Sequence, residues 1–152
     1  MLQTATTVLN NMSYPKLLMN ATQALSPADI RRSIADLIGQ DRLLEADALS
    51  SEALKRFPRS EDTLVARALV TQIRHDWPAA SASLEDLIAL QGPATQAVNW
   101  GQWVRVLRCM GDDARAMSVA AQGLATHPKD AQLQEEFNAL QRIGVKPALK
   151  VA

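Results

Sequence analysis

The chain has 152 residues, and its 16 basic and 16 acidic side chains cancel in net charge. This length suffices for one compact domain or one short repeat array. A neutral chain has no net field that attracts nucleic acid or an anionic membrane, so neither is an expected partner. Aromatic residues make up only 4% of the sequence, while alanine and leucine are abundant, a composition that favours helices over strands.

Cysteine usage and the N-terminal sequence bear on the compartment. The single cysteine, Cys109, excludes an intrachain disulfide and fits a reducing environment. No basic residue precedes Lys16, and no stretch approaches the ~20 apolar residues that a membrane span needs. We therefore expect a cytoplasmic protein without a secretion signal and without membrane insertion.

The N-terminal segment, residues 1–26, is expected to be partly disordered, with room for a short helix. Seven helices are predicted after it. They span residues 27–38, 42–56, 61–74, 77–90, 94–110, 113–126 and 131–143. Six of them follow a residue whose side-chain oxygen can accept a hydrogen bond from the first turn. These expected N-caps are Ser26, Asp41, Ser60, Asp76, Asp112 and Asp130.

The helices recur in pairs. Three sets of residues repeat at spacings of 34 and 36, namely Ile30, Leu64 and Trp100, then Ala46, Ala80 and Ala116, then Ala53, Leu87 and Gly123. Small residues belong where two helices cross closely, and pairs stack because one pair cannot bury its own apolar face. The predicted pairs are residues 27–60, 61–94 and 97–130, followed by a capping helix over 131–143 and a flexible tail over 144–152.

The sequence spacing between pairs, the alanine positions of the second helices and the proline that closes a pair resemble tetratricopeptide repeats (TPR). The resemblance covers Pro27 to about Ile143. It is weaker in the first helices, where the family's usual Leu-Gly pair is replaced by Ser33-Ile34, Arg67-Ala68 and Trp103-Val104. The resemblance implies an all-α, right-handed superhelix of three TPR-like helix pairs with a C-terminal capping helix. Half-a-TPR and HEAT-like helical arrays are the alternatives for the fold.

In arrays of this family, the first helices line a concave groove that binds peptides or helices. The resemblance therefore implies a partner-binding groove made of Arg31, Val65, Leu69, Gln72, Ile73, Gln102, Trp103, Arg105 and Arg108. Val65, Leu69 and Ile73 form an i, i+4, i+8 stripe, which is either an apolar strip for a ligand or ordinary core. Arg105 and Arg108 are either a carboxylate-binding pair or simply solvated side chains.

Two tryptophans share one predicted helix. Tryptophan is both a large core residue and enriched at binding hot spots. We expect Trp100 in the core and Trp103 to face a partner. Catalysis has little support, because Cys109 has no histidine nearby in the sequence and a lone helical cysteine is typically buried. Metal-ligand spacings and phosphate-binding loops are absent from the sequence, so no enzyme activity, cofactor or metal is expected.

These features predict a protein–protein interaction scaffold, adaptor or dedicated chaperone that binds a peptide or helix of a partner protein. A self-assembling structural component of a larger complex is the alternative, and a homodimer remains open. Type III secretion chaperones of the translocator class are similar in size and repeat count, which makes protein secretion one setting for a chaperone role.

Overall fold

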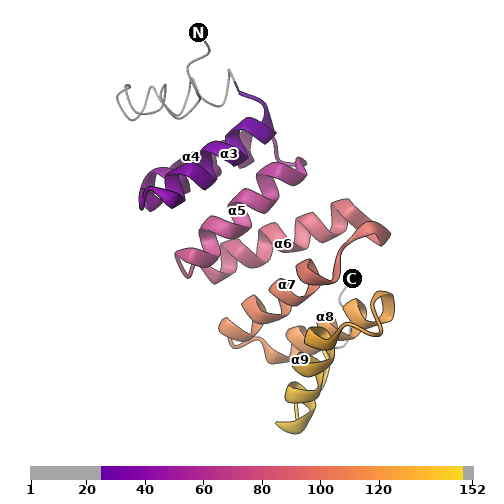
Figure 1. The fold of residues 1–152 in the computed structure, drawn as a ribbon. Helices are drawn as coiled ribbons and strands as arrows, with labels where there is room; N and C mark the ends of the chain where they lie inside the picture. The colour runs from indigo at the N-terminus through magenta and orange to yellow at the C-terminus, as the bar shows by residue number, and fades with distance from the viewer. Residues whose placement is uncertain (1–24, 149–152) are drawn as a thin grey trace. The chain divides into compact units, whose positions relative to one another are not determined.

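The computed structural model describes residues 25–148, and the predictions made for residues 1–24 lie outside this range. Its regular structure comprises seven α-helices and one short 3-10 helix, and the described residues contain no strand (Figure 1). The expectation of an all-α chain is therefore confirmed for this part of the sequence. The chain divides into two compact units, Met1–Arg74 and His75–Ala152, which are described in turn.

Three helices form the described part of the first unit: α3 (Pro27–Gly39), α4 (Leu43–Arg56) and α5 (Glu61–Ile73). Each of these helices packs against both of the others. Alanines on α4 and α5 let the helices approach, and larger aliphatic side chains fill the space between them. The core consists of Ile30, Ile34, Leu37, Ala46, Leu49, Ala53, Ala66 and Val70.

The second unit contains α6 (Trp77–Gln91), the 3-10 helix η1 (Gly92–Ala94), α7 (Ala97–Cys109), α8 (Asp113–Thr126) and α9 (Ala131–Arg142). Helix α7 lies at its centre, because it packs against α6, α8 and α9. The apolar face of α7 is buried accordingly. Its buried side chains include Trp100, Trp103, Val104, Val106 and Leu107.

The helix bounds of the first unit recur in the second unit. Helices α3, α4 and α5 begin at positions 27, 43 and 61, and α7, α8 and α9 begin at positions 97, 113 and 131, so the second set follows the first by one constant step in residue number. This step, called the repeat offset from here on, equals the sum of the two sequence spacings, 34 and 36. The same three helix–helix contacts are present in both sets. The division into three pairs stays a prediction.

Helix α9 buries one face and exposes another. Leu133 and Leu140 are fully buried, whereas Gln134, Asn138 and Gln141 are exposed. At the shorter of the two sequence spacings, the three exposed positions correspond to buried residues of α7, namely Trp100, Val104 and Leu107. Helix α9 therefore presents polar side chains at the positions where α7 presents apolar ones.

Five of the six predicted N-caps are confirmed. The side chains of Ser26, Ser60, Asp76, Asp112 and Asp130 each accept a hydrogen bond from the backbone N–H at position i+3. This bond satisfies one of the free N–H groups of a helix N-terminus. The helix starts were therefore predictable from local sequence.

The prediction for Asp41 is wrong. The N-cap position of α4 is held by Arg42, which makes no side-chain cap hydrogen bond, while Asp41 has a φ of 59°. The turn after α3 needs a residue in the left-handed region, so that the Arg42 N–H can donate to the Leu37 carbonyl at 2.9 Å. Gly111 takes the equivalent position after α7, with a φ of 76°. Asp41 adopts a conformation that glycine adopts without steric cost.

One predicted helix starts too early. The helix predicted over residues 94–110 begins at Ala97, and η1 precedes it. Gly92 has a positive φ of 55°, and the Thr95 hydroxyl donates to its carbonyl at 2.7 Å, so the chain turns before α7 can begin. All the other predicted bounds coincide with the observed ones or differ from them by a single residue, as is usual for helix ends.

Candidate functional site

The predicted apolar stripe lies on α5 in the first unit. Leu69 is 46% exposed and Ile73 is 41% exposed, while Val65 is half-buried. The core face of this helix is formed by other residues, namely Thr63, Leu64, Ala66, Ala68, Val70 and Thr71. Of the two interpretations left open for the stripe, ordinary core is therefore excluded for Leu69 and Ile73.

An ion pair joins α3 to the same face of α5. Arg31 Nη1 lies 3.0 Å from Asp62 Oδ1, and both side chains remain substantially exposed. Asp62 and Val65 are an i, i+3 pair, so the two side chains are neighbours on the helix surface. The structure thus brings Arg31 together with the α5 stripe. An exposed pair of this kind contributes about 0–1 kcal/mol to stability.

This surface of the first unit is called the α3–α5 face from here on. It consists of Arg31, Ala35, Asp62, Val65, Leu69, Gln72 and Ile73. Ala35 is exposed one turn after Arg31, and Gln72 is half-buried with its amide donating to the Ala68 carbonyl at 3.1 Å. The face therefore combines apolar side chains on α5 with a charged pair toward the helix N-termini. All five predicted residues of the first unit belong to it.

The remaining predicted residues lie on α7 in the second unit. Gln102 is half-buried, and Arg105 and Arg108 are exposed. Arg108 forms an ion pair with Glu136 of α9, whereas Arg105 makes no ion pair with any residue in the range 25–148. Since the Arg108 guanidinium is already paired, the two arginines do not form an equal carboxylate-binding pair. Only Arg105 remains as a cation open to an external anion on this helix.

The prediction that Trp103 faces a partner is wrong. Its side chain is 3% exposed, and its Nε1–H donates to the Ser81 hydroxyl of α6 at 3.0 Å. The Arg115 guanidinium lies over the indole ring, 5.3 Å from the ring centroid. Trp103 thus packs between helices of the second unit. The prediction that Trp100 belongs to the core is confirmed by its exposed fraction of 9%.

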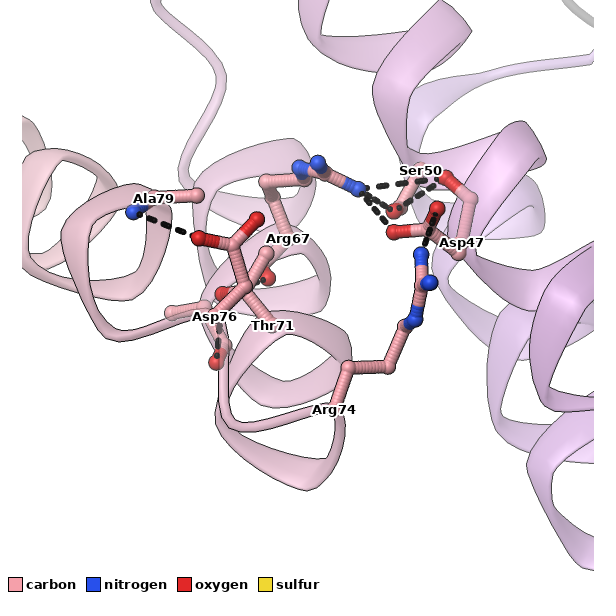
Figure 2. Close-up of polar contacts among 8 residues, drawn as sticks. Asp47, Ser50, Arg67, Thr71, Arg74, Asp76 and Ala79 are labelled. Atoms are coloured by element: carbon pink, nitrogen blue, oxygen red, sulfur yellow. Dashed lines mark hydrogen bonds and ion pairs between the residues drawn. The ribbon is translucent and has the colours of Figure 1, made fainter.

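A polar cluster that was not predicted from the sequence lies between α4 and α5 (Figure 2). Arg67 Nη1 donates to Asp47 Oδ1 at 2.7 Å, to the Asp47 carbonyl at 3.1 Å and to the Ser50 hydroxyl at 2.9 Å. Arg74 pairs with the other carboxylate oxygen of Asp47. The Arg67 side chain is only 13% exposed. The sequence held one indication of this cluster, because Arg67 stands where the resemblance to TPR led us to expect a leucine.

Two titratable side chains away from these surfaces, those of Asp29 and His127, make hydrogen bonds within the chain. The Ser26 hydroxyl donates to the Asp29 carboxylate, and this bond, together with the nearby Arg32, lowers the pKa of Asp29 below its usual value. His127 Nε2–H donates to the Thr95 carbonyl at 2.8 Å. The expectation that Cys109 is buried is wrong, because it is the last residue of α7 and its thiol is free and exposed.

Residues 25–148 contain neither a metal-binding cluster nor a membrane-spanning helix. No cluster of three or more histidine, cysteine, aspartate or glutamate side chains in that range is arranged to hold a metal ion. Among the same residues, no helix has the length and apolar character needed to cross a membrane.

Comparison with models of known protein families finds no match for this chain, and a search of curated proteins finds no similar sequence. Inference about what the chain binds therefore depends on its exposed side chains. The strongest candidate is the α3–α5 face, where the predicted residues of the first unit lie together.

Proposed function

We propose that the protein is a TPR-like interaction module that binds a peptide or helix of a partner protein through the α3–α5 face. The observation that carries the proposal is the pair of exposed apolar side chains, Leu69 and Ile73, one turn apart on α5. The two sequence spacings, 34 and 36, and the recurrence of helix bounds support a repeat architecture. An adaptor and a dedicated chaperone are both forms of this function.

The chemistry of the face fits a ligand with spaced apolar side chains. Burying a whole leucine or isoleucine side chain stabilises by about 1.5–3 kcal/mol, so the exposed parts of Leu69 and Ile73 leave about 1 kcal/mol each for a partner. The exposed pair of Arg31 and Asp62 supplies both a donor and an acceptor beside this apolar area. Apolar contacts would give affinity, and the charged pair would orient the ligand.

The test is a comparison of two leucine substitutions in the full chain. Leu69→Glu places a charge on the α3–α5 face, whereas Leu44→Glu places the same charge on α4, where the native leucine is 71% exposed. Both variants should keep the helical circular dichroism of the native protein. Each is used to capture partners from the source cells, with identification by mass spectrometry.

A partner recovered with the native protein and with Leu44→Glu, but lost with Leu69→Glu, is the expected result. Equal recovery with all three proteins would contradict binding through this face. Light scattering on the same samples tests the alternative of self-assembly. Concentration-dependent association that Leu69→Glu abolishes would identify a second copy of the chain as the ligand of the face.

A further inference from the structure

Three helix junctions in the chain have related positions in the sequence. These are the α4–α5 junction in the first unit and the α6–α7 and α8–α9 junctions in the second unit, and the helices of each are in contact. The residues at positions 47, 81 and 117 follow the spacings of 34 and 36, and those at 67, 103 and 137 follow spacings of 36 and 34. Each junction therefore has one corresponding pair of residues, namely 47 and 67, 81 and 103, or 117 and 137. The three pairs can be compared directly.

The α4–α5 junction is ionic. Asp47 is paired with Arg67 at 2.7 Å and also with Arg74, and the Ser50 hydroxyl provides Arg67 with a further acceptor at 2.9 Å. Arg67 and Asp47 have side chains that are 13% and 22% exposed, so both are largely removed from water. Figure 2 shows both arginines converging on the same carboxylate. The charge of Asp47 is thus matched by two guanidinium groups, one from Arg67 on α5 and one from Arg74 at the C-cap of α5.

The other two junctions carry no ion pair at these positions. At the α6–α7 junction, Trp103 donates a hydrogen bond to Ser81 at 3.0 Å. At the α8–α9 junction, the corresponding residues are Met117, which is buried, and Phe137, which is half-buried. Ala120 stands at the position that corresponds to Ser50 after the repeat offset. The three junctions are therefore ionic, hydrogen-bonded and apolar.

Helix bounds alone do not distinguish the first junction from the third. After the repeat offset, helices α4 and α5 have the same bounds as α8 and α9, apart from the last residue of α9. A chain could therefore dock α9 on α4, or dock α5 on the α8 of another molecule, without a clash of helix lengths. Such exchanges are the usual assembly errors of repeat-containing proteins. Side chains must then supply the discrimination.

We propose that the cluster of Asp47, Arg67 and Arg74 determines that α5, rather than α9, docks on the face of α4 that carries Asp47. If α9 took its place, Phe137 would meet Asp47, and the carboxylate would be buried without its cation. If α5 docked on α8, Arg67 would be buried against Met117 without an acceptor. A buried charge that lacks its partner is strongly unfavourable, whereas the native pairing gives the Asp47 carboxylate two cations and gives Arg67 Nη1 three acceptors.

The proposal predicts that making the first and third junctions alike causes incorrect pairing. The uniform variant combines Asp47→Met, Ser50→Ala and Arg67→Phe, so that these three positions carry the residues found at the corresponding positions of the α8–α9 junction. We expect it to fold, because well-packed apolar residues often replace a buried ion pair without loss of stability. Far-UV circular dichroism and a cooperative urea transition verify the fold.

The measurement is the mass distribution after refolding from urea at a series of protein concentrations, by size-exclusion chromatography with light scattering. The native protein should give the same distribution at each concentration after dilution to a common final value. The uniform variant should give a slowly exchanging fraction of higher mass that increases severalfold with the refolding concentration. Exchange of helices between molecules would produce this fraction.

A second variant separates pairing choice from general destabilisation. The exchanged variant adds Met117→Asp and Phe137→Arg to the uniform variant, which moves the ion pair to the α8–α9 junction and makes the junctions different again. It should return to the native distribution. A uniform variant that refolds like the native protein at every concentration would overturn the proposal. An unfolded uniform variant would also overturn it, because the cluster would then supply stability rather than discrimination.

Discussion

Replacing Gly123 by alanine tests how closely α8 approaches its neighbours. A Cβ atom at this position would lie 3.0 Å from Cδ1 of Leu133 and 3.0 Å from Cβ of Trp100. In the first unit, Ala53 occupies the equivalent position and is fully buried. There the larger tryptophan is replaced by Ile30, which leaves room for a methyl group. The second unit therefore accommodates Trp100 by giving up the methyl group at position 123.

Two opposing effects determine the expected free energy of unfolding. Alanine is favoured over glycine within a helix by about 0.5–1 kcal/mol. Overpacking of a filled core costs about 1–3 kcal/mol, and here both contacting atoms belong to buried side chains. We expect the overpacking to dominate, so that Gly123→Ala lowers the free energy of unfolding by roughly 0.5–2 kcal/mol.

The assay is urea denaturation followed by far-UV circular dichroism. Gly101→Ala is the matched control, because Gly101 also lies within a helix of the second unit and a Cβ there would approach Gln132 no closer than 3.7 Å. The control should stabilise by about 0.5–1 kcal/mol. Adding Trp100→Ile to Gly123→Ala recreates the residue pair of the first unit and should show favourable coupling of about 0.5–3 kcal/mol. If Gly123→Ala stabilises as much as Gly101→Ala, the close approach inferred at this position is wrong.

Two further predictions concern stability in urea. Asp41→Gly should raise the free energy of unfolding by up to about 1 kcal/mol, because it relieves a left-handed residue, and Gly111→Ala at the equivalent turn should lower it by about 1–2 kcal/mol. Opposite signs for the two are required, and equal signs would refute the argument from φ. Asp47→Ala should cost about 1–3 kcal/mol, because it leaves the guanidinium of Arg67 short of an acceptor, whereas Asp62→Ala at an exposed pair should cost less than about 1 kcal/mol. Similar losses for these two aspartates would show that burial of the Arg67 cluster contributes little.

The number of helices among residues 25–148 and most of their starts were predictable because their determinants are local. An N-cap side chain bonds to a backbone group within the same helical turn, and helix breakers stand beside the residues that they affect. Asp41 shows the limit of this reasoning. An aspartate before a helix suits both an N-cap and a left-handed turn residue, and the hydrogen bonds from the turn back to α3 decide between the two.

Side-chain environments on the first helices were harder to predict. Trp103 directly follows Gln102, and successive residues of a helix are rotated by about 100° around its axis. This rotation is enough to leave Gln102 half-buried and to bury Trp103 at the α6–α7 junction. The pairing of Asp47 with Arg67 joins two different helices and depends on how they dock. Periodicity identified Val65, Leu69 and Ile73 as one stripe, but only the packing of α5 determined which helix face was covered.

The polar face of α9 has a consequence for redesign of the chain. Gly144 follows α9 with a φ of 78°, and the Val145 N–H donates to the Leu140 carbonyl, as the residues after α3 and α7 do. The turn after α9 therefore has the hydrogen bond and the left-handed residue of the turns that lead into α4 and α8. A further helix would need an apolar surface to pack against, and the exposed face of α9 carries Gln134, Asn138 and Gln141 instead. Three substitutions, to the residue types present on α7, together with a grafted copy of α8, should add one helix after α9.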